Sequence, residues 1–373
     1  AQLAQAFARL MVKDEKLLEG LKPFIVDQRY RFPPQSASMV VNAYARLNLL
    51  DRNLLSSITA VFTQGLAAEN ERQDSILACT ADVMAGKKLV THPYDHVAVT
   101  QLLNAHAKIR VFDQAFFHAA MDWMTPQRLS ECSPQSLAIA LHALAKFPGL
   151  RTGREALARL RALFATCVPE ITRRARDFTV QNLVNSLQAF SLVRVREQEL
   201  LAAAERQLLR RRASWKTQDV ANLASSLARL ERFSEDAFSA LAAAAAGKCG
   251  SFRSDELATL LNALAHYARQ PGDGPGRRQQ ALAHAATVLP AFEAAARRLD
   301  PGHLVRSTDF EVALMLNSFT KVRPQDAAAL DQLLAELERR AERKPVTLVE
   351  VGLVFGALAR VRRLPPPHFE RAS

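Results

Sequence analysis

A six-residue pattern of apolar and polar positions recurs nine times between residues 5 and 361. Each copy reads polar, small, bulky apolar, small, usually basic, and apolar. Counted back from the final residue, bulky apolar positions fall at 0, 3, 6, 7 and 10, the spacing of one face of an amphipathic helix. The pattern predicts a helix that ends at each copy. The copies are QAFARL (5–10), NAYARL (42–47), NAHAKI (104–109), HALAKF (142–147), QAFSLV (188–193), SSLARL (225–230), NALAHY (262–267), NSFTKV (317–322) and GALARV (356–361).

The spacing of these copies predicts a repeat protein. Their final residues lie 37, 62, 38, 46, 37, 37, 55 and 39 positions apart, so a unit of about 37 residues recurs with insertions. A second apolar helix follows the motif in each unit, as in 197–212 and 235–248. Helix pairs repeated at this period are typical of an α-solenoid. We predict an all-α fold, one continuous α-solenoid of about nine helix pairs over residues 1–373, with insertions near 66–95, 148–178 and 268–300.

Residue types at the helix starts and on the apolar stripe refine this prediction. Ser and Thr accept hydrogen bonds from the free N–H groups of a first helical turn, so they mark helix starts. The predicted N-caps are Ser133, Thr179, Thr217, Ser254, Thr308 and Thr347. The third motif position lies on the apolar stripe, so its rings are expected in the core rather than free to stack on bases. These rings belong to Phe7, Tyr44, His106, Phe190 and Phe319.

The opposite side of each motif helix carries the candidate binding residues. Positions 12, 8, 5 and 1 before the motif end lie on one line along the helix, and most are polar. The penultimate position is Lys or Arg in seven of nine copies, where the overall content of 49 in 373 would place about one. Cations match phosphates, and amides and imidazoles pair with base edges, so these rows suit single-stranded nucleic acid. The predicted RNA-binding residues are Asn42, Arg46, Asn104, Lys108, His142, Lys146, Asn185, Gln188, Asn222, Arg229, Asn262, Asn317, Lys321 and Arg360.

A purely structural role for the same rows stays open at this stage. A recurring Asn can tie a helix to the backbone of its neighbour, and a cation near a helix C-terminus is favoured by the helix dipole. Further basic clusters follow the second helices and could be a solvated face or a positive edge for RNA. They are Arg173, Arg174 and Arg176; Arg210 to Arg212; Arg297 and Arg298; Arg339, Arg340, Arg343 and Lys344; and Arg362 and Arg363.

Composition narrows the class of partner. The formal net charge of +12 and the pI of about 10.0 favour a polyanion such as nucleic acid or an anionic membrane surface. No stretch of about 20 apolar residues occurs, so we expect no membrane-spanning segment. The four cysteines, Cys79, Cys132, Cys167 and Cys249, are too far apart along the chain to indicate a zinc site or a disulfide framework.

Signals for catalysis are weak. The chain has no P-loop, GxGxxG, HExxH or GxSxG motif. His92 and His96 are four residues apart but have no third metal ligand nearby. We therefore expect no enzymatic activity, metal, cofactor or small-molecule substrate.

Four motif segments carry a resemblance to a known family. Residues 135–147, 219–233, 255–269 and 350–364 resemble the helical repeats of about 37 to 38 residues in octotricopeptide and heptatricopeptide proteins, which bind organellar RNA. The likeness covers nearly the whole chain. It departs from the octotricopeptide pattern in lacking the Trp before the ALA element, which brings it closer to the heptatricopeptide type. No RAP-type C-terminal domain is visible, so the nuclease activity associated with that domain has no support.

The resemblance implies binding to organellar RNA. Where mitochondrial rRNA is fragmented, such proteins are also permanent parts of the ribosome, which implies rRNA and neighbouring ribosomal proteins as partners and the mitochondrial matrix, or alternatively a plastid, as location. We expect a structural component of a mitochondrial ribosome that holds rRNA segments. The alternatives are a free factor that stabilises or processes organellar RNA, and a scaffold that binds a protein segment without RNA.

Overall fold

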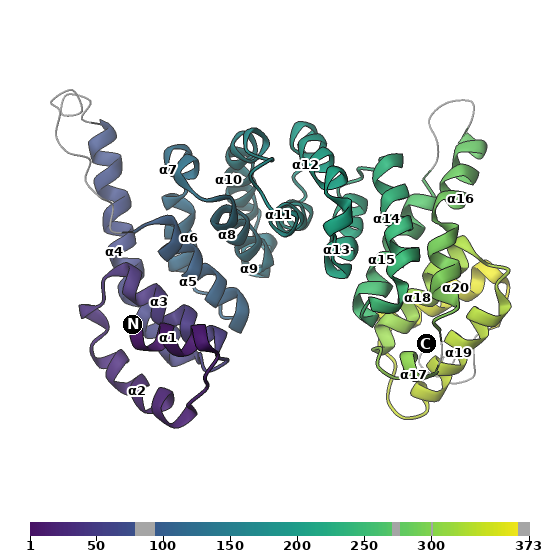
Figure 1. Cartoon of the computed structure of the whole chain (residues 1–373), viewed down its shortest axis with the longest axis horizontal. Coiled ribbons are helices and arrows are strands. Elements are labelled where there is room, and N and C mark those ends of the chain that lie inside the picture. Colours follow the sequence, from purple (N-terminus) through teal and green to yellow (C-terminus); the bar gives the residue numbers. More distant parts are fainter. Residues whose placement is uncertain (79–93, 271–276, 300, 365–373) are drawn as a thin grey trace. The chain divides into compact units, whose positions relative to one another are not determined.

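The structure is a computed structural model that describes residues 1–78, 94–270, 277–299 and 301–364. These residues form helices joined by turns, with no strand among them (Figure 1), so the all-α prediction is confirmed. The chain divides into two compact units, unit 1 (Ala1–Leu200) and unit 2 (Leu201–Ser373), which we describe separately. The prediction of one continuous domain over residues 1–373 stays a prediction.

Unit 1 places five motif helices in one row and their partner helices beside them. Each of α3, α5, α8 and α11 packs against the motif helix before it in the chain. The second helices form their own series, in which α2 contacts α4, α4 contacts α6, and α7 contacts α10. The elements are α1 (Gln2–Leu10), α2 (Glu15–Asp27), η1 (Arg29–Arg31), α3 (Pro34–Arg46), α4 (Arg52–Ala78), α5 (His96–Ile109), α6 (Gln114–Trp123), α7 (Pro126–Glu131), α8 (Pro134–Lys146), α9 (Pro148–Thr152), α10 (Arg154–Arg173) and α11 (Val180–Val193).

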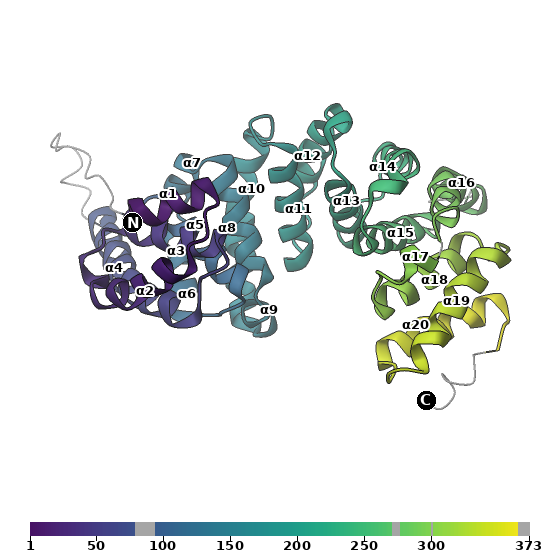
Figure 2. The ribbon, with the colours of Figure 1, turned by 60° about the horizontal axis from the view of Figure 1, so that its bottom comes forward.

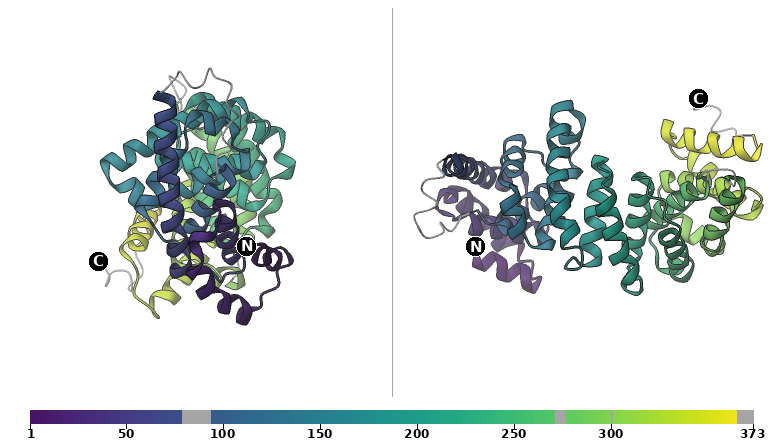
Figure 3. Two further views of the ribbon diagram at one scale, coloured as in Figure 1. Left: turned by 90° about the vertical axis from the view of Figure 1, so that its left-hand side faces the viewer. Right: turned by 90° about the horizontal axis from the view of Figure 1, so that it is seen from above.

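Unit 2 repeats this arrangement with the last four motif helices. Helix α13 packs against α15, α15 against α18, and α18 against α20, and this order can be followed in Figure 2 and by colour in Figure 3. The partners α14, α16 and α19 pack beside α13, α15 and α18, while α12 (Gln198–Arg210) spans the boundary of the units. The other elements are η3 (Arg212–Ser214), α13 (Thr217–Arg229), α14 (Glu235–Lys248), η4 (Cys249–Ser251), α15 (Ser254–Ala268), α16 (Arg277–Ala296), α17 (Pro301–Leu304), α18 (Asp309–Val322), α19 (Ala327–Ala341) and α20 (Leu348–Val361).

Four of the six predicted N-caps are confirmed. The side chains of Ser133, Thr179, Thr308 and Thr347 each accept a hydrogen bond from the backbone N–H three residues later. The predictions at Thr217 and Ser254 are wrong by one residue. Lys216 and Arg253 occupy the cap positions there, and the Asp219 and Glu256 carboxylates accept their backbone N–H groups at 3.0 and 3.1 Å.

The core follows the apolar stripe of the motif. Four of the five rings predicted for the core, those of Tyr44, His106, Phe190 and Phe319, are fully buried, and Phe7 in the first helix is half-buried. His106 is held as a neutral ring, because burial lowers its pKa and its two nitrogens bond the Val111 carbonyl at 2.8 Å and the Thr59 hydroxyl at 2.9 Å. The recurring aromatic position therefore serves packing.

The predicted insertions coincide with lengthened second helices. Residues 66–78 of the predicted insertion near 66–95 extend α4, and residues 79–93 lie outside the described part of the chain. The segment 148–178 forms α9 and α10, and 277–296 forms α16.

Candidate nucleic-acid interface

The six penultimate motif cations that are predicted to bind RNA lie at the C-terminal ends of their motif helices. Arg46, Lys146 and Arg229 are the last residues of α3, α8 and α13, and Lys108, Lys321 and Arg360 stand one residue before the ends of α5, α18 and α20. All are exposed except Lys321, which is half-buried. Each unit therefore carries a row of positive charge along one end of its packed motif helices.

Four of these six cations have no bonding partner among the described residues. Within the described residues, the side chains of Arg46, Lys146, Arg229 and Lys321 make neither a hydrogen bond nor an ion pair. The Lys146 pKa is lowered first by burial and then by the positive charge of Arg110, and no carboxylate opposes these effects. An unpaired cation beside another cation is suited to an anionic ligand.

The other two cations are bonded to the preceding repeat. Lys108 donates its Nζ to the carbonyl of Ala45 at the end of α3. Arg360 donates to Asn317 Oδ1 and, at 3.2 Å, to Thr320 Oγ1 in α18. At these two positions the cation has the structural role that the sequence left open, since it bonds the neighbouring helix. A cation near carbonyls and hydroxyls at a helix end satisfies their free acceptors.

The amide row shows a similar division. His142 and Gln188, equivalent positions in neighbouring motif copies, bond each other at 3.1 Å between Nε2 and Oε1. Burial, followed by the nearby Lys146, lowers the pKa of His142 to about 4, so this imidazole is neutral at pH 7 and bonds as a neutral donor. Asn317 is the other member with an internal partner, and it is buried at 8% exposure.

Five predicted amides remain open. The side chains of Asn42, Asn104, Asn185, Asn222 and Asn262 make no hydrogen bond within the described part of the chain, and each is exposed or half-buried. A free amide offers two donors and an acceptor. Of the fourteen predicted residues, the structure leaves these five amides and four cations with unused hydrogen-bonding capacity, while five are bonded to a neighbouring repeat.

Sequence reasoning missed a second recurrent contact, which we name the turn clamp. At the end of a second helix, one donor side chain bonds a backbone carbonyl in the turn before the motif helix of the same repeat. Arg174 reaches Cys132 O at 2.9 Å, Arg298 reaches Phe252 O at 2.7 Å, and Arg340 reaches Ser307 O and Leu304 O at 2.6 Å. Lys248 bonds Trp215 O in the same way, and in the third repeat the Trp123 indole N–H bonds Tyr94 O at 3.1 Å.

The turn clamp changes the interpretation of the basic clusters after the second helices. Arg174, Arg298 and Arg340 each belong to a cluster that could have been a positive edge for RNA, and all three are committed to the backbone of their own repeat. The sequence signal was present, since each cluster sits where a second helix ends. It could not separate the bonded cation from its neighbours.

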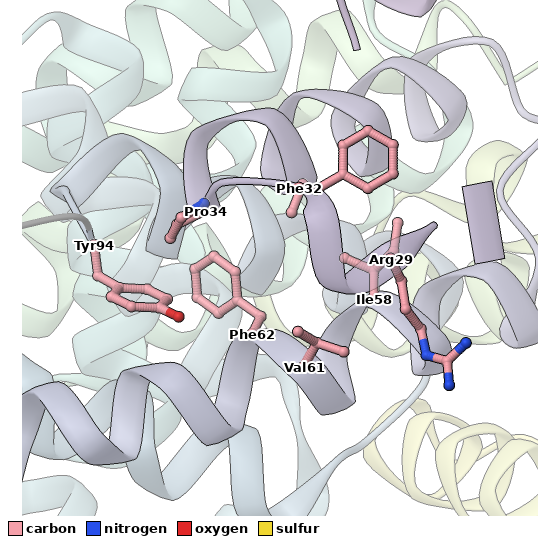
Figure 4. A pocket seen from close by; sticks show the side chains of 8 residues that line it. Arg29, Phe32, Pro34, Ile58, Val61, Phe62 and Tyr94 are labelled. Carbon is pink, nitrogen blue, oxygen red and sulfur yellow. The ribbon is translucent and has the colours of Figure 1, made fainter. Parts of the chain in front are cut away.

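Unit 1 also contains a small cavity. It is lined by Arg29, Phe32, Pro34, Ala37, Ile58, Val61, Phe62 and Tyr94 (Figure 4). The rings of Phe62 and Tyr94 pack edge to face with centroids 4.9 Å apart. Arg29 is the cavity's one charged residue, and its guanidinium already donates to Val26 O at 2.7 Å and to the Tyr30 hydroxyl at 3.1 Å. This cavity offers packing contacts but no free charged group.

Other kinds of site find little support in the described residues. The described residues contain no group of three or more His, Cys, Asp and Glu side chains placed to hold a metal ion. His92 lies outside the described residues. Cys132, Cys167 and Cys249 are buried free thiols, whose pKa is raised by burial, and Cys79 lies outside the described residues. No described helix combines the length and apolar character needed to cross a membrane.

Comparison with protein-family models and with curated proteins does not assign the chain to a family, so a function must be argued from its residues. No protein-family model matches the chain, and no curated protein matches it.

Proposed function

We propose that this protein is an RNA-binding helical-repeat protein whose helices form one α-solenoid of about nine repeats. One observation carries the proposal: four motif cations, Arg46, Lys146, Arg229 and Lys321, have no partner within the described residues. Two of their helices, α3 and α13, also bear the open amides of Asn42 and Asn222. Unpaired cations provide non-specific attraction to phosphates, and neighbouring amides can bond unstacked bases. The net charge of +12 acts in the same direction.

We further propose that the RNA is ribosomal and that the protein is a structural component of a mitochondrial ribosome. This step rests on the resemblance of the motif segments to octotricopeptide and heptatricopeptide repeats. The protein would hold rRNA segments beside neighbouring ribosomal proteins, without catalysis.

The binding proposal is tested by removing three of the unpaired cations. The variant carries Arg46→Gln, Lys146→Gln and Arg229→Gln, and the matched control carries Arg52→Gln, Arg154→Gln and Arg206→Gln, three exposed cations on second helices. Affinity for a 20-nucleotide single-stranded RNA is measured by fluorescence anisotropy between about 50 and 300 mM salt. The slope of log K against log salt changes by about 0.7 per phosphate contact, so the variant should lose about 2 from this slope and the control little. Equal slopes in both variants would refute binding through the motif row.

The ribosomal proposal needs the native complex. The protein is purified from its own cells at moderate salt after ultraviolet crosslinking, and the attached RNA is sequenced and its sedimentation recorded. Crosslinks to rRNA in particles of ribosomal size support the proposal. Crosslinks to messenger or precursor RNA in small particles would instead indicate a processing factor, and absence of RNA would indicate a protein scaffold.

A further inference from the structure

Three consecutive motif copies in unit 2 bring together a group of basic residues. The penultimate motif positions of copies seven, eight and nine hold His266, Lys321 and Arg360, and Arg269 follows His266 by one helical turn. Helix α15 packs on α18 and α18 on α20, so these equivalent positions are neighbours across the two helix contacts. We name His266, Arg269, Lys321 and Arg360 the cationic cluster.

The members of the cationic cluster act on one another. Burial is the largest cause that lowers the pKa of His266, Lys321 and Arg360, and in each case the charged groups that lower it further are also cations. Lys321 and Arg269 act on His266, Arg360 and Arg269 act on Lys321, and Arg269 acts on Arg360. No carboxylate contributes to any of these shifts. The folded protein thus holds like charges close together without compensation, which is unfavourable unless an anion is bound.

The hydrogen bonds of Arg360 leave one edge of its guanidinium available to a ligand. Its Nε and Nη2 atoms are fixed by Thr320 Oγ1 and Asn317 Oδ1, so the guanidinium plane is held in place. Its Nη1 atom makes no hydrogen bond within the described residues, and neither do the Arg269 and Lys321 side chains. A fixed guanidinium with a free N–H edge beside a second Arg and a Lys is the donor set that recognises phosphate oxygens.

We propose that the cationic cluster at the ends of α15, α18 and α20 is a phosphate-binding site for the sugar–phosphate backbone of RNA. The charged donors bind phosphate oxygens, which every nucleotide carries, so the site takes an internal phosphodiester regardless of sequence. This inference rests on the proposed function as far as RNA is concerned, while the affinity for a phosphate group does not depend on it. A terminal phosphate of RNA has the same chemistry and is separated below.

The first test uses RNA binding. The double variant Arg269→Gln, Lys321→Gln is compared with a control of equal charge, Arg297→Gln, Arg306→Gln, whose residues are exposed and lie in the same unit. The cluster variant should bind a 5′-hydroxyl 20-nucleotide RNA about tenfold more weakly, with a salt slope reduced by about 1 to 2, and the control should stay within about twofold. RNA binding with equal affinities in both variants would overturn the site and leave the proposed function standing. If only a 5′-phosphorylated RNA distinguishes the variants, the site stands and its ligand is the terminal phosphate.

The second test is independent of RNA. The protein with ¹³C-labelled histidine is titrated by NMR with and without inorganic phosphate, and His266 is assigned through His266→Gln. A bound anion opposes the effect of Lys321 and Arg269, so the pKa of His266 should rise when phosphate is added and stay unchanged in the double variant. A pKa of His266 that phosphate does not move would overturn the site. A rise in a protein that binds no RNA would keep the site and reject the proposed function.

A stability measurement tests whether weaker binding in the variant comes from unfolding. Since Lys321 has no bonding partner among the described residues and is surrounded by like charge, Lys321→Gln should not lower the unfolding midpoint. A marked fall would show that the residue stabilises the fold, and would overturn its assignment to a ligand site.

Discussion

In several repeats the C-terminal ends of the two helix types both carry Lys or Arg and use these residues differently. At the ends of second helices, Arg174, Arg298 and Arg340 bond backbone carbonyls of their own repeat. At the ends of motif helices, Arg46 and Lys146 have no partner within the described residues. A second helix runs back beside the start of its motif helix, where a turn exposes unpaired carbonyls, whereas the motif helix ends beside other helix ends. A high count of Lys and Arg therefore combines two populations, of which one stabilises the repeat and the other is available to a ligand.

The largest expected loss of stability comes from removing Arg340, which makes more bonds than any other turn-clamp donor described above. Arg340→Ala removes hydrogen bonds to Ser307 O and Leu304 O and ion pairs with Asp309 and the buried Glu336. It should lower the free energy of unfolding of unit 2 by about 3 kcal/mol, measured by urea denaturation. Arg339→Ala is the control, because Arg339 pairs with Glu336 from a more exposed position, and it should cost under about 1 kcal/mol. Similar losses in both variants would remove the distinction.

His142 tests the electrostatic effect of an unpaired motif cation. Its folded pKa, about 4, lies below the ordinary value of 6.5, so the neutral form is favoured in the folded state. The stability that this provides is complete above about pH 6.5 and is lost as pH falls toward 4, by up to about 3 kcal/mol. His142→Gln should flatten this part of the stability curve, and Lys146→Gln should reduce the loss because one of its causes is gone. A curve of unchanged steepness in His142→Gln would contradict the assignment.

The turn clamp formed by Trp123 uses a neutral donor, the indole N–H, where the Arg340 turn clamp uses a charged one. Trp123→Phe keeps most of the buried ring and removes the indole N–H that bonds Tyr94 O. Leaving that carbonyl unpaired should cost about 1 kcal/mol of unfolding free energy, less than Arg340→Ala, because a neutral donor makes a weaker bond than a charged one. Hydrogen exchange at the start of α5 would report the same loss locally. No change in either measurement would show that the contact is incidental.

The smallest effect separates two cations within the motif row. Lys108→Met loses the hydrogen bond to Ala45 O and should cost about 0.5 to 1 kcal/mol, whereas Arg46→Met, at a position with no bond within the described residues, should change stability by under about 0.5 kcal/mol. In RNA binding the order should reverse, with Arg46→Met the more damaging. If the two variants lose equal stability and equal RNA affinity, the bond to Ala45 O does not keep Lys108 from binding RNA.

How far the sequence predicted this fold depends on the range of the interactions involved. The motif helices, the buried rings of Tyr44 and Phe190, and the caps at Ser133 and Thr179 follow from periodicity and from bonds that span three or four residues. The caps at Thr217 and Ser254 were misplaced because the carboxylates of Asp219 and Glu256 favour a start one residue earlier. For the candidate site, the rows were predictable, but the bonds that occupy Lys108, Gln188 and Arg360 were not, because each connects different repeats.

The sequence by itself determined nine amphipathic helices with a polar line on each, because helical periodicity needs only the order of residues along the chain. Only the tertiary structure decided which cations are free. The acceptors that occupy the turn-clamp donors lie 29 to 46 residues earlier in the chain, and no local pattern encodes that separation. The same holds for the cationic cluster, where three motif copies place like charges together only because α15, α18 and α20 pack side by side. Local spacing sets where a charge stands on its helix, and packing sets what it meets.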